Sequence, residues 1–326
     1  MGAINTFLFN ILSGINSFIG NYGWSIVIFT VIIKTLLLPL DFKSRKSMRR
    51  MSDLQPQVAK LQKKYANDKE KLNQKTAELY RKEHISPLSG CLPMLLSFPV
   101  LIAMFGAMRM VANNELAKQT IDFIVTGTQQ NQGWLWVKNL WMPDSPFASF
   151  VATETELKAI PVDIWRMVLT PDVLEQLASV GIVIDTIDTN TYQLLLSQLL
   201  VMPEYTALLT KWASLPEVNL LVFKLQIFAN NNGLFITPIL AAVTQYLMTI
   251  TQPQTPSATG SKGTGQFMKY FFPLFSLYIC STFNAGFSIY WVTANLIAWG
   301  EGIIINKMME KQSANNNTII QEDSLK

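Results

Sequence analysis

The sequence has few of the side chains on which metal and catalytic centres are usually built. It contains one histidine, His84, and two cysteines, Cys91 and Cys280, which lie in or beside apolar runs without metal-ligand spacing. A lone histidine and scattered carboxylates do not make a nucleophile–base arrangement. We therefore expect no catalytic residues, no metal and no cofactor, and we expect both cysteines to be inert, reduced thiols.

Charge is also scarce, and its first occurrence is unusual. Only 15% of the 326 residues are charged while 49% are hydrophobic, which is typical of a polytopic membrane protein. Residues 1–33 carry no charge, and the first one, Lys34, lies inside the apolar run 24–40. A lysine at the centre of a membrane helix costs roughly 2.5–3.5 kcal/mol, so Lys34 is a candidate functional residue. The alternative is a side chain that snorkels to the interface beyond Leu40.

The N-terminus lacks the basic segment of a cleavable signal peptide. Instead, residues 4–19 repeat apolar side chains at spacings of three and four, which predicts a helix lying flat in the membrane interface.

The distribution of charge predicts the topology. Residues 42–84 hold 13 basic and 5 acidic side chains, a net charge of +8, whereas residues 111–233 hold 6 basic and 12 acidic side chains, a net charge of −6. Basic loops stay in the cytoplasm, so we place 42–84 inside and 111–233 outside. Two helices with narrow apolar seams, separated by an N-cap at Asp68, predict that the basic segment is a helical hairpin.

Five apolar stretches of spanning length predict an all-α membrane protein with the N-terminus outside and the C-terminus in the cytoplasm. The polar end, residues 312–326, is expected to lack regular structure. The predicted segments are 1–20 (interfacial helix), 21–40 (first transmembrane helix), 41–86 (basic cytoplasmic hairpin), 87–111 (second transmembrane helix), 112–232 (extracytoplasmic region), 233–251 (third transmembrane helix), 252–266 (cytoplasmic loop), 267–307 (fourth and fifth transmembrane helices) and 308–326 (cytoplasmic tail).

Several stretches together carry a family resemblance. They are IIKTLLLPL (Ile32–Leu40), the long block from Leu54 to Phe105 that runs from the hairpin into the second span, WLWVKNLWMPD (Trp134–Asp144), ITPILAAVTQYLM (Ile236–Met248) and the two spans of Phe271–Leu296. The chain resembles the YidC family of membrane-protein insertases, in the Oxa superfamily, over roughly residues 20–145 and 233–307.

The resemblance implies five membrane helices around a hydrophilic groove that opens to the cytoplasm and the lipid. It implies a multi-pass protein of the bacterial plasma membrane that draws polar, often acidic, tails of nascent membrane proteins into the groove and releases their apolar segments into the bilayer. The family carries one positive charge on the first span, usually Arg, where this chain has Lys34. Lysine keeps the charge but lacks the planar bidentate fork of arginine.

Further groove residues follow from this assignment. Glu301, where Gln is common in the family, lies at about the depth of Lys34 and is a candidate charge partner for it; the alternative is that Glu301 snorkels into cytoplasmic water. The polar and aromatic groove candidates besides Lys34 are Thr30, Ser97, Gln245, Ser281, Tyr290, Trp291 and Asn295, each of which could instead make an ordinary helix–helix contact.

The hairpin and the outer region have less defined roles. The family resemblance implies that the hairpin captures substrate early. Contact with a ribosome or with lipid headgroups is left open, as is a simple spacer role. The basic residues of the hairpin include Arg45, Lys46, Arg49, Arg50, Lys63 and Lys64. Residues 146–232 stand where the family normally has a short outer connection. Their sequence predicts a helix from Pro171 through Val180, followed by helices over 188–202 and 203–213.

The expected partners are nascent membrane proteins and the lipid bilayer. Cooperation with a Sec translocon is left open, and no specific binding to nucleic acid is expected. Two other functions compete with insertion. A small-solute transporter or channel would show inverted repeats, which are not apparent, and an assembly scaffold that only binds finished helices is not distinguished by sequence.

Overall fold

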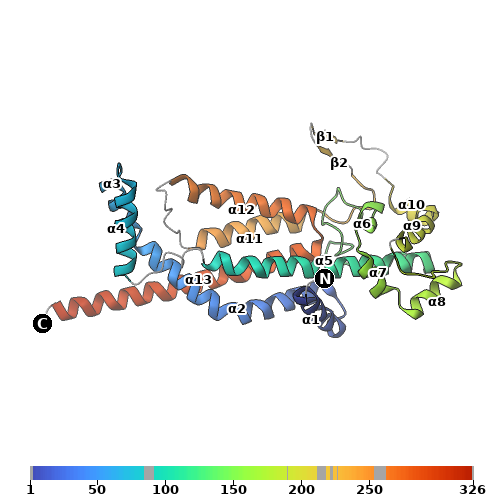
Figure 1. Cartoon of the computed structure of the whole chain (residues 1–326), viewed down its shortest axis with the longest axis horizontal. Coiled ribbons are helices and arrows are strands. Elements are labelled where there is room, and N and C mark those ends of the chain that lie inside the picture. Colours follow the sequence, from blue (N-terminus) through green and yellow to red (C-terminus); the bar gives the residue numbers. More distant parts are fainter. Residues whose placement is uncertain are drawn as a thin grey trace. The chain divides into compact units, whose positions relative to one another are not determined.

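The computed structural model describes residues 3–83, 92–188, 190–210, 218–220, 223–225, 227–252 and 262–324. Almost all regular structure in these residues is helical (Figure 1), as the sequence predicts. The helices are α1 (Ala3–Ile19), α2 (Tyr22–Asp53), α3 (Gln55–Lys64), α4 (Lys69–Lys82), α5 (Leu92–Thr126), α6 (Glu154–Lys158), α7 (Val162–Val168), α8 (Pro171–Ser179), α9 (Thr191–Val201), α10 (Pro203–Leu208), α11 (Ile236–Thr251), α12 (Lys262–Thr282) and α13 (Ala285–Ser324).

A short antiparallel pair of strands interrupts this pattern in the segment that the sequence predicts to lie outside the membrane. Strands β1 (Val218–Leu220) and β2 (Phe223–Leu225) pair with Val218 opposite Leu225. These strands could not be predicted from the sequence, because three residues are too few to display the alternating pattern of a strand.

The chain divides into two compact units, and the boundaries between them fall inside helices α2, α5, α11, α12 and α13. The first unit comprises residues 1–29, 102–240 and 277–291; the second comprises residues 30–101, 241–276 and 292–326. We name them after the sequence predictions: the outer unit holds the segment predicted to lie outside, and the groove unit holds Lys34.

Several helices run past the ends that the sequence predicted. Helix α2 continues through Pro39 to Asp53, because no glycine and no second proline follow Pro39 before that point. Helix α5 continues from the second predicted span to Thr126 and ends at Gly127, whose positive φ of 70° is readily adopted by glycine. The tail expected to lack regular structure is helical as far as Ser324, in a stretch that also lacks glycine and proline.

Two helices in the described part of the chain are long and apolar enough to cross a membrane. They are α2 and the first 27 residues of α13, Ala285–Lys311. The other predicted spans correspond to α5, α11 and α12, of which α11 has only 16 residues. Five spans therefore remain a prediction.

The basic hairpin forms as a pair of helices, α3 and α4 (Figure 1). The side chain of Asp68 caps α4 by accepting a hydrogen bond from the backbone nitrogen of Lys71 at 2.9 Å, which confirms the predicted N-cap. A small apolar cluster joins the end of α2 to both helices and contains Met51, Leu54, Val58, Leu79 and Tyr80. His84 and Cys91 lie outside the described residues.

The segment predicted to be an extracytoplasmic insertion contains the short helices α6 to α10, and the predicted helix after Thr170 is confirmed as α8. The buried Tyr205 of α10 connects the insertion to α5: its ring lies edge-on to Phe123, with centroids 5.3 Å apart, and its hydroxyl donates to the carbonyl of Ala152. Burial, with a smaller contribution from Glu156, raises the pKa of the Tyr205 phenol, so the hydroxyl stays protonated and remains a donor.

Candidate functional site

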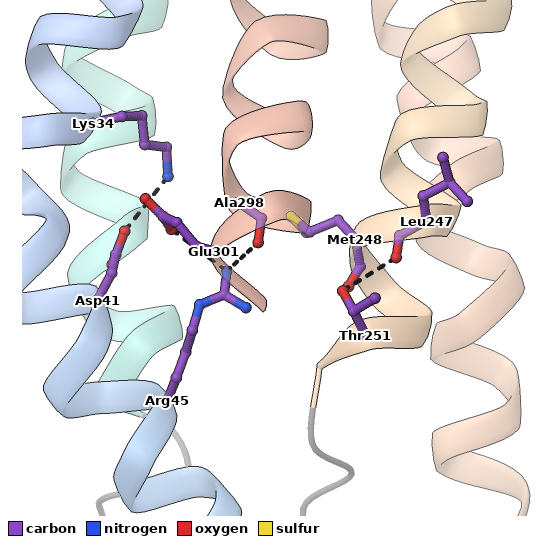
Figure 2. A network of polar contacts seen from close by, with 8 residues as sticks. All are labelled: Lys34, Asp41, Arg45, Leu247, Met248, Thr251, Ala298 and Glu301. Atoms are coloured by element: carbon purple, nitrogen blue, oxygen red, sulfur yellow. Dashed lines mark hydrogen bonds and ion pairs between the residues drawn. The ribbon is translucent and has the colours of Figure 1, made fainter. Parts of the chain in front are cut away.

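Lys34 does not stand alone on its helix. Its Nζ lies 3.7 Å from Oδ2 of Asp41, and the two side chains are 21% and 19% exposed (Figure 2). Asp41 follows Lys34 by seven residues and Arg45 follows it by eleven, which is about two and three turns of an α-helix. These three charged side chains of α2 therefore share one face of the helix.

A second ion pair lies on the same face and is more deeply buried. Nη2 of Arg45 is 3.9 Å from Oε2 of Glu301 on α13, and the two side chains are 10% and 8% exposed. The same Nη2 donates a hydrogen bond of 2.9 Å to the backbone carbonyl of Ala298, one turn before Glu301. Arg45 thus connects α2 to α13 within the groove unit, through an ion pair with the carboxylate of Glu301 and a hydrogen bond to the carbonyl of Ala298.

The glycine after Glu301 leaves room for the close approach of Arg45. A Cβ added to Gly302 would lie 3.1 Å from Nη1 of Arg45 and 3.0 Å from Oγ1 of Thr251 at the end of α11. Asn306, one turn farther along α13, donates to the backbone carbonyl of Thr251 at 3.0 Å. The end of α11, the middle of α13 and α2 therefore meet at this cluster (Figure 2).

The cluster contains buried polar atoms that form no hydrogen bond with any residue that the structure describes. Ser44 Oγ, Arg45 Nη1 and Glu301 Oε2 are buried without a hydrogen-bond partner among the described residues. Buried polar atoms are normally bonded, so exceptions call for an explanation. These atoms can bond to water or to a polar ligand.

Glu301 was a candidate charge partner for Lys34. The ion pairs join Glu301 to Arg45 and Lys34 to Asp41, but Lys34 also acts electrostatically on the Glu301 carboxylate, so a role of Glu301 in tuning Lys34 stays a prediction. Arg45 was predicted to belong to the basic hairpin, but its side chain is buried in α2. The reason is that α2 extends beyond Pro39, which carries the periodic face of Lys34 into the basic segment. The remaining basic residues of that assignment are partly or fully exposed: Lys46, Arg49, Arg50, Lys63 and Lys64.

Other predicted groove residues fall into both units. Thr30, Gln245 and Asn295 are buried in the groove unit, where Nδ2 of Asn295 lies 3.5 Å from Oγ1 of Thr244. This contact fits either a polar groove lining or an ordinary bond between α13 and α11. The side chain of Ser97 is not among those described.

The aromatic candidates and Ser281 belong to the outer unit. Tyr290 is buried and Trp291 is half-buried, and both rings lie near Phe287, with centroid distances of 6.2 and 5.5 Å. The hydroxyl of Ser281 donates to the carbonyl of Tyr278 at 2.7 Å. These contacts are typical of helix packing.

The outer unit also holds a cavity of about 380 Å³. Aromatic rings of Phe105, Trp141, Phe283 and Phe287 line it, together with the exposed Arg109. None of the predicted groove residues with a described side chain is among its lining residues.

Comparison with known proteins agrees with the resemblance seen in the sequence. The family model described as 60Kd inner membrane protein matches residues 14–312. A "Membrane protein insertase YidC" from Fusobacterium nucleatum is 49% identical over 106 residues, which are 32% of this chain and 52% of the relative. Proteins of the same name from Cupriavidus taiwanensis and Leptospira interrogans are 36% identical over 166 residues and 41% identical over 126 residues.

These alignments cover 48% and 39% of this chain and 26% and 18% of those two relatives. The chain thus spans about half the length of the Fusobacterium relative and about a quarter or less of the other two.

Proposed function

The chain belongs to the 60Kd inner membrane protein family, and from this premise we propose that it inserts nascent membrane proteins into the lipid bilayer. In this proposal Lys34 attracts the polar, often acidic, tail of a substrate into a hydrophilic groove. The apolar segment of the substrate then leaves sideways into lipid.

The observation that carries the proposal is the setting of Lys34. It is a half-buried cation on α2, the more apolar of the two helices able to cross a membrane. Charge inside a membrane segment is expensive and is usually associated with function. The neighbouring carboxylates, and the buried polar atoms that have no hydrogen-bond partner among the described residues, support the proposal that a substrate carboxylate can replace one of the resident groups.

The physical steps need no covalent chemistry. Moving a polar tail through hydrocarbon leaves its backbone groups unpaired, at several kcal/mol for each group. A groove that holds water part-way through the membrane shortens that path. Attraction between an ammonium and a carboxylate is about 4 kcal/mol at 4 Å where the effective dielectric constant is near 20, against about 1 kcal/mol in bulk water. Burial of apolar substrate side chains in lipid, at about 0.8 kcal/mol per methylene, favours release.

The basic hairpin is proposed to meet the substrate before the groove does. Its helices α3 and α4 present mostly exposed polar and basic side chains around a small apolar cluster. Such a surface suits anionic substrate tails, lipid headgroups or a ribosome, and cooperation with a Sec translocon belongs to the same proposal. We place the hairpin in the cytoplasm and the N-terminus outside, in agreement with the positive-inside rule.

Substitution of Lys34 tests the proposed function directly. The full chain is reconstituted in lipid vesicles, and insertion is measured for one short substrate with an acidic tail and for a matched substrate with a neutral tail. We expect Lys34→Ala to reduce insertion of the acidic substrate about tenfold, which corresponds to about 1.4 kcal/mol, and to leave the neutral substrate nearly unchanged. Lys34→Arg should retain activity, because it keeps the charge.

The matched control is Lys158→Ala, which removes the same charge from an exposed position of α6, outside both the proposed groove and the basic hairpin. It should have little effect on either substrate. Equal loss with both tails, or equal loss in the control, would contradict a specific role for the Lys34 charge.

A further inference from the structure

The cation of the proposed groove already has an anion beside it. Oδ2 of Asp41 lies 3.7 Å from Nζ of Lys34, which is close enough for an ion pair but longer than a hydrogen bond. Both side chains keep about a fifth of their surface exposed. The contact is therefore electrostatic, partly exposed, and held by no described hydrogen bond.

The neighbouring pair has the opposite character. Arg45 and Glu301 are about nine-tenths buried, and Arg45 is also tied to the carbonyl of Ala298. Removing one partner of a buried pair leaves an uncompensated charge, so exchange of either group with a substrate is strongly disfavoured. Of the two resident carboxylates, Asp41 is the one that can be exchanged.

Charge balance favours exchange over simple addition. Lys34, Asp41, Arg45 and Glu301 together carry no net charge. A substrate carboxylate added to this cluster would leave an excess negative charge in a partly desolvated site, which is costly. If the Asp41 side chain turns to solvent as the substrate carboxylate arrives, the balance is preserved.

We propose that Asp41 is a specificity-determining residue: its carboxylate occupies Lys34 in the resting protein and must be displaced by a carboxylate of the substrate tail. This inference rests on the proposed function. It predicts that Asp41 sets a threshold, so that tails with several carboxylates compete well with Asp41 while tails with one carboxylate compete poorly.

The test compares Asp41→Asn with two matched variants in the reconstituted full chain. Asp41→Glu keeps a carboxylate at the position, and Asp53→Asn removes the same charge from an exposed i,i+4 pair with Arg49 on the same helix. Insertion is measured against substrate concentration for tails with no, one and three carboxylates. A second readout follows acylation of the Lys34 amine by a water-soluble reagent, quantified by mass spectrometry.

We expect Asp41→Asn to lower the half-saturating concentration of the one-carboxylate tail by about two- to tenfold, the range of a weak to moderate ion pair. The neutral tail should be unaffected, and Lys34 should be acylated faster. Asp41→Glu and Asp53→Asn should behave like the unmodified protein in both readouts.

Three results would overturn the inference: no change on Asp41→Asn, an equal change for all tails, or the same change on Asp53→Asn. The proposed function fails separately, when Lys34→Ala inserts acidic tails normally. If Lys34 is required but Asp41→Asn has no effect, Lys34 keeps its role and only the exchange with Asp41 is rejected.

Discussion

Replacing Arg45 with methionine is expected to lower the free energy of unfolding by roughly 3–5 kcal/mol, because it leaves the buried carboxylate of Glu301 without its counter-ion. The hydrogen bond to the carbonyl of Ala298 is lost in the same step. Methionine fills a volume similar to that of the arginine stem, so the effect should come mainly from charge. Denaturant titration in detergent micelles measures the change.

The same helix provides the control for this prediction. Arg49 pairs with Asp53 at 3.4 Å, but the two side chains are 35% and 59% exposed. Arg49→Met should therefore change stability by less than about 1 kcal/mol. The double variant Arg45→Met/Glu301→Leu should recover most of the loss, because a buried ion pair replaced by apolar groups is often neutral. A loss in the double variant as large as the two single losses combined would contradict coupling between Arg45 and Glu301.

Replacing Asp144 with alanine is expected to destabilise the outer unit by about 3 kcal/mol or more. This carboxylate is fully buried and accepts four hydrogen bonds. Its donors are the backbone nitrogens of Leu234, Phe235 and Thr237 at 2.9, 3.2 and 2.7 Å, and the indole nitrogen of Trp136 at 2.9 Å. Loss of a helix N-cap costs about 0.5–2 kcal/mol, and each buried donor left unpaired adds about 1–3 kcal/mol.

Asp163→Ala is a suitable control for this change, since Asp163 is 60% exposed and makes one i,i+3 ion pair with Arg166. It should leave stability nearly unchanged. Thermal unfolding followed by Trp fluorescence measures both variants, and a loss below 1 kcal/mol for Asp144→Ala would contradict the capping role. Gly233 supports that role, because a Cβ there would lie 2.0 Å from Oδ1 of Asp144.

The sequence was most informative where a local pattern determines the outcome. The lone charge at Lys34 in an apolar run indicated the candidate site. The cap at Asp68 and the helix after Thr170 could be predicted because capping depends on residues close in sequence. The helical class followed from the apolar runs, and the family from the combination of several motifs.

The partners of Lys34 and Glu301 could not be predicted in the same way. Placing Arg45 against Glu301 requires knowing that α2 continues to Asp53 and that Gly302 allows its approach to α13. One signal was available, however: Lys34, Asp41 and Arg45 recur at intervals of seven and four, which places them on one helical face. The proline at position 39 obscured it, because proline usually marks the end of a helix.

The motif Trp134–Asp144 contains a residue whose structural role has no local signal in the sequence. Its residues contributed to the family resemblance, but nothing local indicated what Asp144 does. Its hydrogen-bond partners at the start of α11 lie about 90 residues later in the chain. Contacts of this kind become visible only in the folded structure.

The central claim is that the positive charge at position 34 brings acidic tails into the groove unit. Photo-crosslinking tests it most directly, with a photoreactive amino acid in place of Leu38, which is 42% exposed and one turn from Lys34. During insertion, we expect capture of an acidic tail with Lys34 or Lys34→Arg, little capture with Lys34→Ala, and little capture of a neutral tail. Equal capture of both tails whatever residue occupies position 34 would contradict the claim.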